Sequence, residues 1–153
     1  MSHSNPDRAL STFSGWLALA VFAVYALIAA WQYPVVLPSV LVAAGFGALA
    51  CIAVLAGFRY WRLTLLLAGV VYLVIYGIRV GRMALMGAEA AKSHVLSGLY
   101  YYYGMMPQLT NAAFQEKGVA GAAAHIYLEY FLPVLVVVLL VTTLAGLRRA
   151  RSG

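Results

Sequence analysis

Four apolar stretches, each close to the length of a membrane-spanning helix, take up most of the chain. The hydrocarbon core of a bilayer is about 30 Å thick, and an α-helix needs roughly 20 apolar residues to cross it. Charged residues make up only 9% of the sequence, so they interrupt these stretches rarely. The stretches cover about residues 14–31, 39–58, 62–83 and 123–147. The sequence therefore predicts a polytopic membrane protein whose residues 1–153 form a single membrane domain.

The four stretches are expected to be helices. A backbone in lipid must satisfy its own hydrogen bonds, which leaves helices and closed barrels, and these stretches lack the alternating polarity of barrel strands. The first two connections are short: Pro34 and Pro38 bound one, and residues 59–62 form the other. Short connections place consecutive helices antiparallel. The expected fold class is all-α, a bundle of four transmembrane helices.

The distribution of basic residues indicates the orientation. Lysine and arginine are more frequent in cytoplasmic loops than in outer ones. Six arginines fall on the side of the two termini, and four basic residues fall on the other side. The first group is Arg8, Arg59, Arg62, Arg148, Arg149 and Arg151, and the second is Arg79, Arg82, Lys92 and Lys117. We therefore expect both termini to be cytoplasmic and the protein to lie in a bacterial inner membrane.

The segment between the third and fourth stretches, about residues 87–122, is too long and too apolar for a simple connection. From Ser93 onward apolar residues recur near helical spacing, which predicts a short amphipathic helix that ends before Pro107. A second short helix follows, closed by Gly118. The segment is expected to form a partly helical extracytoplasmic cap.

Four consecutive tyrosines lie within this segment. Successive side chains on a helix point about 100° apart, so four of them surround it. A phenol ring suits the boundary between acyl chains and water, and the sequence therefore favours an interfacial aromatic collar. The alternative is an aromatic platform for a quinone, a lipid or a partner helix. These residues are Tyr100, Tyr101, Tyr102 and Tyr103.

Three charges are expected at one depth near the outer membrane boundary. A rise of 1.5 Å per residue places Arg79 at ~25 Å and Arg82 at ~30 Å above Arg62. The same rise places Glu129 at ~28 Å above Arg148. An unpaired ion within a membrane is costly, so we expect an ion pair between Glu129 and either arginine. The alternative is a site for a lipid headgroup or another anionic ligand.

His125 and Glu129 are four residues apart, so on a helix both side chains point the same way. Imidazole and carboxylate groups together can hold a divalent metal. The sequence has no His-Glu-x-x-His motif, and a lone histidine near an interface usually makes hydrogen bonds. We therefore expect no metal site and no cofactor, and we keep His125 as a candidate for ligand binding.

Three functional hypotheses follow. The favoured one is a non-catalytic subunit that packs against and stabilises a larger membrane protein complex. The second is an enzyme or binding protein that acts on a lipid or quinone at the outer interface, and the third is a small permease component or channel. The expected partners are membrane lipids and other integral-membrane subunits or further copies of the chain. The topology accounts for the net charge of +6, so no nucleic-acid partner is expected.

Overall fold

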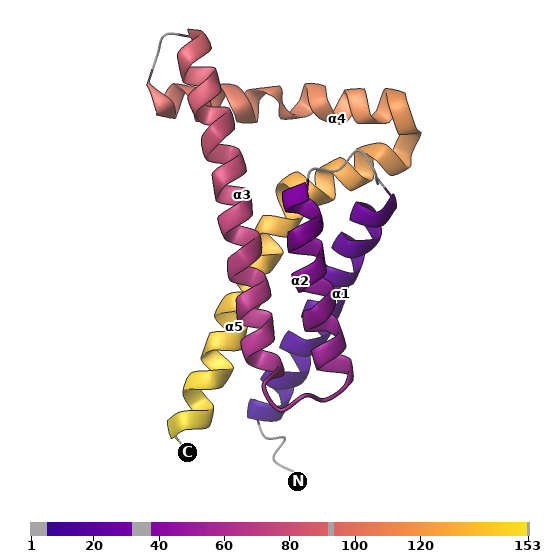
Figure 1. Ribbon diagram of the computed structural model, residues 1–153, viewed down its shortest axis with the longest axis vertical. Helices are drawn as coiled ribbons and strands as arrows, with labels where there is room; N and C mark the ends of the chain where they lie inside the picture. Colours follow the sequence, from indigo (N-terminus) through magenta and orange to yellow (C-terminus); the bar gives the residue numbers. More distant parts are fainter. Residues whose placement is uncertain (1–5, 32–37, 92–93, 153) are drawn as a thin grey trace. The chain divides into compact units, whose positions relative to one another are not determined.

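The computed structural model describes residues 6–31, 38–91 and 94–152, and this part of the chain is helical apart from one short turn and the residue before α4 (Figure 1). The elements are α1 (Pro6–Trp31), α2 (Pro38–Leu55), α3 (Trp61–Ala91), α4 (Val95–Ile126), the π-helix η1 (Tyr127–Phe131) and α5 (Leu132–Ser152). Four segments are long and apolar enough to cross a membrane. They are Thr12–Trp31, Pro38–Leu55, Trp61–Glu89 and Ser97–Arg148. The predicted all-α fold with four membrane spans is confirmed.

The chain divides into two compact units. Unit 1 consists of Met1–Leu73 and Leu132–Gly153, and unit 2 consists of Val74–Phe131. The long helix α3 therefore contributes its first part to unit 1 and its second part to unit 2. The predicted residues Pro34 and Lys92 lie outside the described residues, as do the side chains of Arg8, Arg149 and Arg151.

The core of unit 1 depends on small residues that let α1 and α2 approach closely. Phe22 is fully buried on α1. A Cβ atom added to Gly47 of α2 would lie 2.6 Å from Cδ1 of its ring. The hydroxyl of Tyr25 donates a hydrogen bond to the carbonyl of Val40 at 3.2 Å. Its ring meets that of Tyr72 on α3 edge to face, with centroids 5.6 Å apart.

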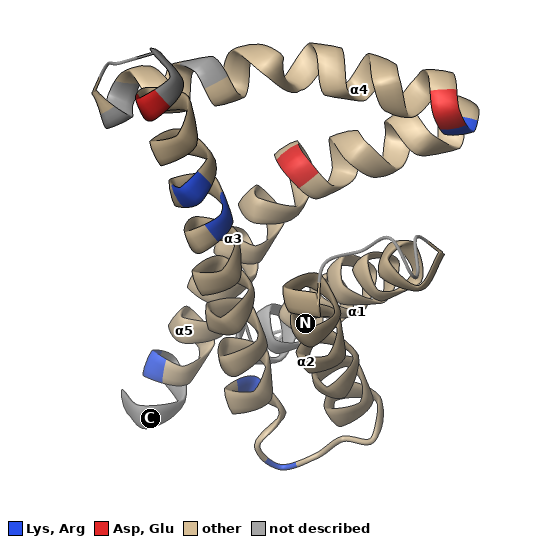
Figure 2. Cartoon of the chain, turned by 45° about the horizontal axis from the view of Figure 1, so that its top comes forward, with Lys and Arg blue, Asp and Glu red and all other residues tan. Residues whose placement is uncertain are grey.

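The connection from α2 to α3 is a tight turn at one end of unit 1. Gly57 has a φ of 63°, a conformation that glycine adopts without a Cβ clash. The amide of Phe58 then donates to the carbonyl of Ala53 at 3.0 Å, which completes the usual cap of a helix that ends in glycine. The last turn of α5 reaches the same end of the unit (Figure 1). Basic residues of the turn, of the start of α3 and of α5 are therefore gathered at this end (Figure 2).

Unit 2 is a helical hairpin packed on the second part of α3. Helix α4 reverses direction at Gly118, whose φ of 65° and ψ of −154° are not helical (Figure 1). We call residues 95–117 the first arm of α4 and residues 119–126 the second arm. At Gly98 the first arm touches the backbone of α3. A Cβ atom there would lie 1.9 Å from the carbonyl oxygen of Ala84. Glycine is thus required for this crossing.

The prediction that a helix ends before Pro107 is wrong, because α4 continues through this residue to the kink at Gly118. Proline removes one backbone donor and favours a helix end. Here Tyr102 and Met106, which precede Pro107 by five residues and one residue, are buried in a cluster with Val80 of α3. This packing holds the helix in place, while the proline ring is exposed.

Candidate functional site

A cluster of polar side chains in unit 2 joins α3, α4 and η1. The carboxylate oxygen Oε2 of Glu129 accepts a hydrogen bond from Nη2 of Arg79 at 2.8 Å and another from the hydroxyl of Tyr102 at 3.1 Å. The hydroxyl of Tyr76 donates to the backbone carbonyl of Glu129 at 3.4 Å. Three helices are thus connected through one acidic residue, and we call these four residues the Glu129 cluster.

The sequence around Glu129 explains why its backbone takes part. In an α-helix the amide of residue 133 would bond to the carbonyl of residue 129, but Pro133 has no amide proton. The hydroxyl of Tyr76 reaches that carbonyl instead. Glu129 also lies in the π-helix Tyr127–Phe131. Such single-turn π segments recur at functional sites in proteins.

The ion pair in the cluster is largely shielded from solvent. The side chain of Glu129 is 10% exposed and that of Arg79 is 31% exposed. The guanidinium carbon Cζ of Arg79 also lies 5.2 Å from the centre of the Tyr76 ring, where the face of the ring attracts a cation. A carboxylate so shielded requires a cationic partner, and Arg79 supplies it. Arg82, the alternative partner, is exposed.

The four tyrosines have separate environments. Tyr102 is 7% exposed and packs with Val80 and Met106, so its hydroxyl points into the Glu129 cluster. Tyr103 meets the ring of Tyr102 edge to face, with centroids 5.3 Å apart. Tyr100 is 84% exposed, and the side chain of Tyr101 lies outside the described part of the structure.

His125 faces a different partner from Glu129, although the two are four residues apart. Its Nδ1 atom lies 2.9 Å from the hydroxyl oxygen of Thr110, on the first arm of α4. The same hydroxyl donates to the carbonyl of Met106 at 3.0 Å. When the Thr110 hydroxyl donates its proton to that carbonyl, its oxygen can only accept a hydrogen bond from His125. Nδ1 must then be the protonated nitrogen of the His125 ring. This hydrogen bond therefore links the first arm of α4 to the second.

Metal binding has no candidate among the residues that the structure describes, since no three of their His, Cys, Asp and Glu side chains form a group that could hold an ion. His94, just before α4, is exposed.

The structure thus brings together Arg79, Tyr102 and Glu129 of the residues singled out in the sequence. It adds two that the sequence analysis missed, Tyr76 and Thr110. Tyr76 precedes Arg79 by three residues and so shares a face of α3 with it. This spacing, together with Pro133 four residues after Glu129, could have indicated Tyr76 from the sequence.

No protein-family model matches the chain, and the comparisons with curated proteins and with solved structures find no match. The class of protein therefore rests on the fold. Over residues 6–31, 38–91 and 94–152 the protein is all-α, with four helices long and apolar enough to cross a membrane.

Proposed function

We propose that the chain is a small non-catalytic integral-membrane subunit that packs against and stabilises a larger membrane protein complex. One observation carries the proposal: an exposed face on the first arm of α4. Its members recur at spacings of three and four residues, which places them on one side of the helix. They are Tyr100, Tyr103, Pro107, Asn111 and Phe114, all of them exposed. We call this side the aromatic face.

Exposed aromatic residues on an anchored helix suit a protein partner. Tyrosine and phenylalanine are enriched in protein interfaces, and exposed apolar patches on a folded unit often mark interaction sites. Buried Tyr102 and Met106 fix the other side of the arm. The aromatic face is therefore formed before a partner arrives, which lowers the entropic cost of binding.

The charged groups of unit 2 support a packing role over a reactive one. The carboxylate of Glu129 is already bonded to Arg79 and Tyr102 within the fold. An ion pair of this kind fixes the relative positions of helices and leaves the acid little freedom to exchange a proton with a substrate.

The proposed location is a bacterial inner membrane, with both termini in the cytoplasm. The support is the basic end of unit 1, which by the positive-inside rule belongs on the cytoplasmic side. The α4 hairpin would then be the extracytoplasmic part of the subunit. The proposed partner is another integral-membrane protein that meets this hairpin through the aromatic face.

The experiment is native mass spectrometry of the protein purified gently from its own membranes. A larger protein at fixed stoichiometry is expected. Replacing both Tyr100 and Phe114 by alanine should weaken that association about 30-fold, the effect of losing roughly 2 kcal/mol at an interface. The matched control replaces Leu85 and Met86 by alanine, since both are exposed on α3 in the same unit. A chain that purifies alone, or equal losses in the two double variants, would contradict the proposal.

A second candidate function, an enzyme or binding protein acting on a lipid or quinone, is favoured by the pair of His125 and Thr110. A histidine held by a hydroxyl at 2.9 Å is oriented for proton transfer. In that case His125→Ala should abolish turnover or binding of the lipid or quinone while the protein stays folded. A conservative His125→Gln variant should fail in the same way, because glutamine does not titrate.

A further inference from the structure

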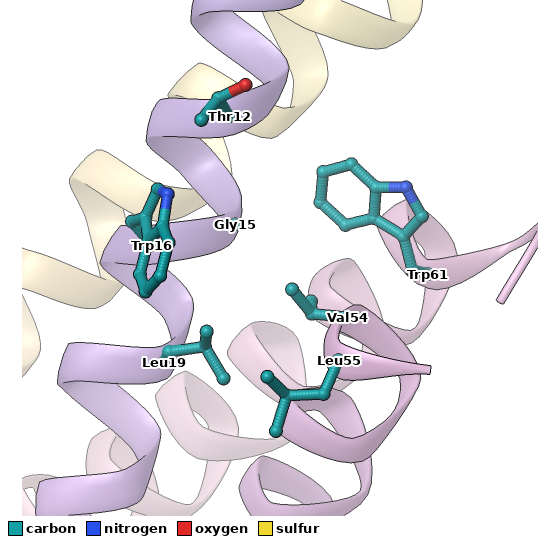
Figure 3. Close-up of a pocket in the computed structure, with 7 residues that line it drawn as sticks. All are labelled: Thr12, Gly15, Trp16, Leu19, Val54, Leu55 and Trp61. Carbon is teal, nitrogen blue, oxygen red and sulfur yellow. The ribbon is translucent and has the colours of Figure 1, made fainter. Parts of the chain in front are cut away.

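An apolar groove opens on unit 1 at the end where its basic residues gather. Two indole rings, from Trp16 on α1 and Trp61 at the start of α3, flank it, and Leu19 and Leu55 lie between them (Figure 3). The groove has a volume of about 330 Å³. This is within the range of roughly 300–1,000 Å³ that is typical of small-molecule sites.

Gly15 on α1 and Val54 on α2 are neighbours among the residues that line the groove. Gly15 has no side chain, and a Cβ atom there would lie 3.4 Å from Cγ1 of Val54. Helices α1 and α2 are therefore close enough for ordinary van der Waals contact here, and the larger side chains around this point form the sides of the groove. Trp16 is 69% exposed and Leu55 is 74% exposed. The groove thus opens outward, toward the surroundings of the spans.

An arginine lies beside one wall of the groove. The guanidinium carbon Cζ of Arg62 is 5.4 Å from the centre of the Trp61 ring, which is itself a wall of the groove. The guanidinium of Arg59 lies 5.5 Å from the Tyr60 ring in the adjoining turn. The sequence of unit 1 contains six arginines and one acid, Asp7. The end of the unit that holds the groove is therefore strongly positive.

We propose that this groove binds an anionic phospholipid. An acyl chain lies against Leu19 and Leu55 between the two indoles, and the phosphate pairs with Arg62, whose guanidinium lies over the Trp61 ring. The positive charge favours an anionic lipid over the other occupants. An apolar partner helix would fill the groove but would leave the guanidinium groups without an anion. A second copy of the chain would bring its own positive end to the groove and be repelled. The site lies in unit 1 and does not depend on the proposed function of the aromatic face in unit 2.

The chain offers a built-in probe, since it has three tryptophans and two of them flank the groove. In a Trp31→Phe background the fluorescence therefore reports on Trp16 and Trp61. The protein is reconstituted into vesicles that mix phosphatidylglycerol and phosphatidylcholine, with brominated acyl chains placed on one lipid and then, at equal abundance, on the other. Quenching should be stronger when the bromine is on phosphatidylglycerol.

Two variants test the two halves of the site. Arg62→Gln should lower the preference for phosphatidylglycerol about fivefold, the expected effect of one basic residue near an anionic membrane surface. Its control is Arg82→Gln, which removes the same charge from an exposed position in unit 2 and should keep the preference. Leu55→Ala should reduce quenching, whereas Leu49→Ala, an exposed leucine on the same helix, should not.

Equal quenching by the two lipids, or equal effects of Arg62→Gln and Arg82→Gln, would overturn the proposal. Protection of both tryptophans from either brominated lipid would also overturn it, because the groove would then be covered by protein.

Discussion

Glu129 and Arg79 are fifty positions apart in the sequence, and yet Oε2 of the acid lies 2.8 Å from Nη2 of the arginine. The bond connects η1 to α3, and the hydroxyl of Tyr102 adds α4 to the same oxygen atom. Because the acid is 10% exposed, water can replace neither partner easily. The ion pair is therefore expected to contribute strongly to the stability of unit 2.

Removing one member of this pair should destabilise the protein. Glu129→Ala and Arg79→Ala should each lower the free energy of unfolding in detergent by about 3–5 kcal/mol, because each leaves an uncompensated charge in a shielded site. The double variant should lose less than the sum, by about 0.5–3 kcal/mol. Additive losses in this double-mutant cycle would show that the two side chains do not interact. Arg82→Ala, at an exposed position, should stay within about 0.5 kcal/mol of the parent protein.

The hydroxyl of Tyr102 should matter more than that of any exposed tyrosine. Tyr102→Phe keeps the ring within its buried cluster and removes one hydrogen bond to a carboxylate, which should cost about 1.5–3 kcal/mol. Tyr100→Phe removes the same atom from a side chain that is 84% exposed and should be nearly neutral. Thermal unfolding of the two variants in the same detergent measures the difference. Equal stabilities would mean that the bond of Tyr102 to Glu129 contributes nothing.

Two glycines on the first arm of α4 should respond in opposite ways to alanine. At Gly98 a Cβ atom would lie 1.9 Å from the carbonyl oxygen of Ala84, so Gly98→Ala should force α3 and α4 apart and cost about 1–3 kcal/mol or more. At Gly104 nothing lies within 4 Å of the added atom. Gly104→Ala should therefore stabilise the helix by about 0.5–1 kcal/mol. Loss of stability in both variants would show that the contact with Ala84 is not the cause.

The sequence predicts the spans well because their signal is local. A bilayer requires a certain length of apolar chain, and that length can be counted. The ion pair could be predicted only as a choice between Arg79 and Arg82, since helix rise gives the depth of a residue but not the direction of its side chain. The π-helix Tyr127–Phe131 changes that direction just where Glu129 lies, and nothing in the residue pattern marks it.

The other differences have the same origin in tertiary contacts. Pro107 favours a helix end locally, but the buried side chains of Tyr102 and Met106 keep α4 helical through it. The groove in unit 1 is built by side chains from three helices, so no single stretch of sequence contains it. Trp16 and Trp61 lie far apart in the sequence, near the ends of two different spans.

The packing of α1 on α2 provides a final prediction, with its control two residues away. At Gly47 a Cβ atom would lie 2.6 Å from Cδ1, 3.0 Å from Cγ and 3.1 Å from Cβ of the fully buried Phe22. Because one of these atoms is next to the Phe22 backbone, rotating the ring cannot relieve all three contacts. Gly47→Ala should cost about 1–3 kcal/mol in the free energy of unfolding. Gly45→Ala, with nothing within 4 Å, should be neutral or stabilising by up to about 1 kcal/mol. Unfolding in detergent separates the two variants, and a Gly47→Ala protein as stable as the parent would mean that α1 and α2 pack less closely than the structure has them.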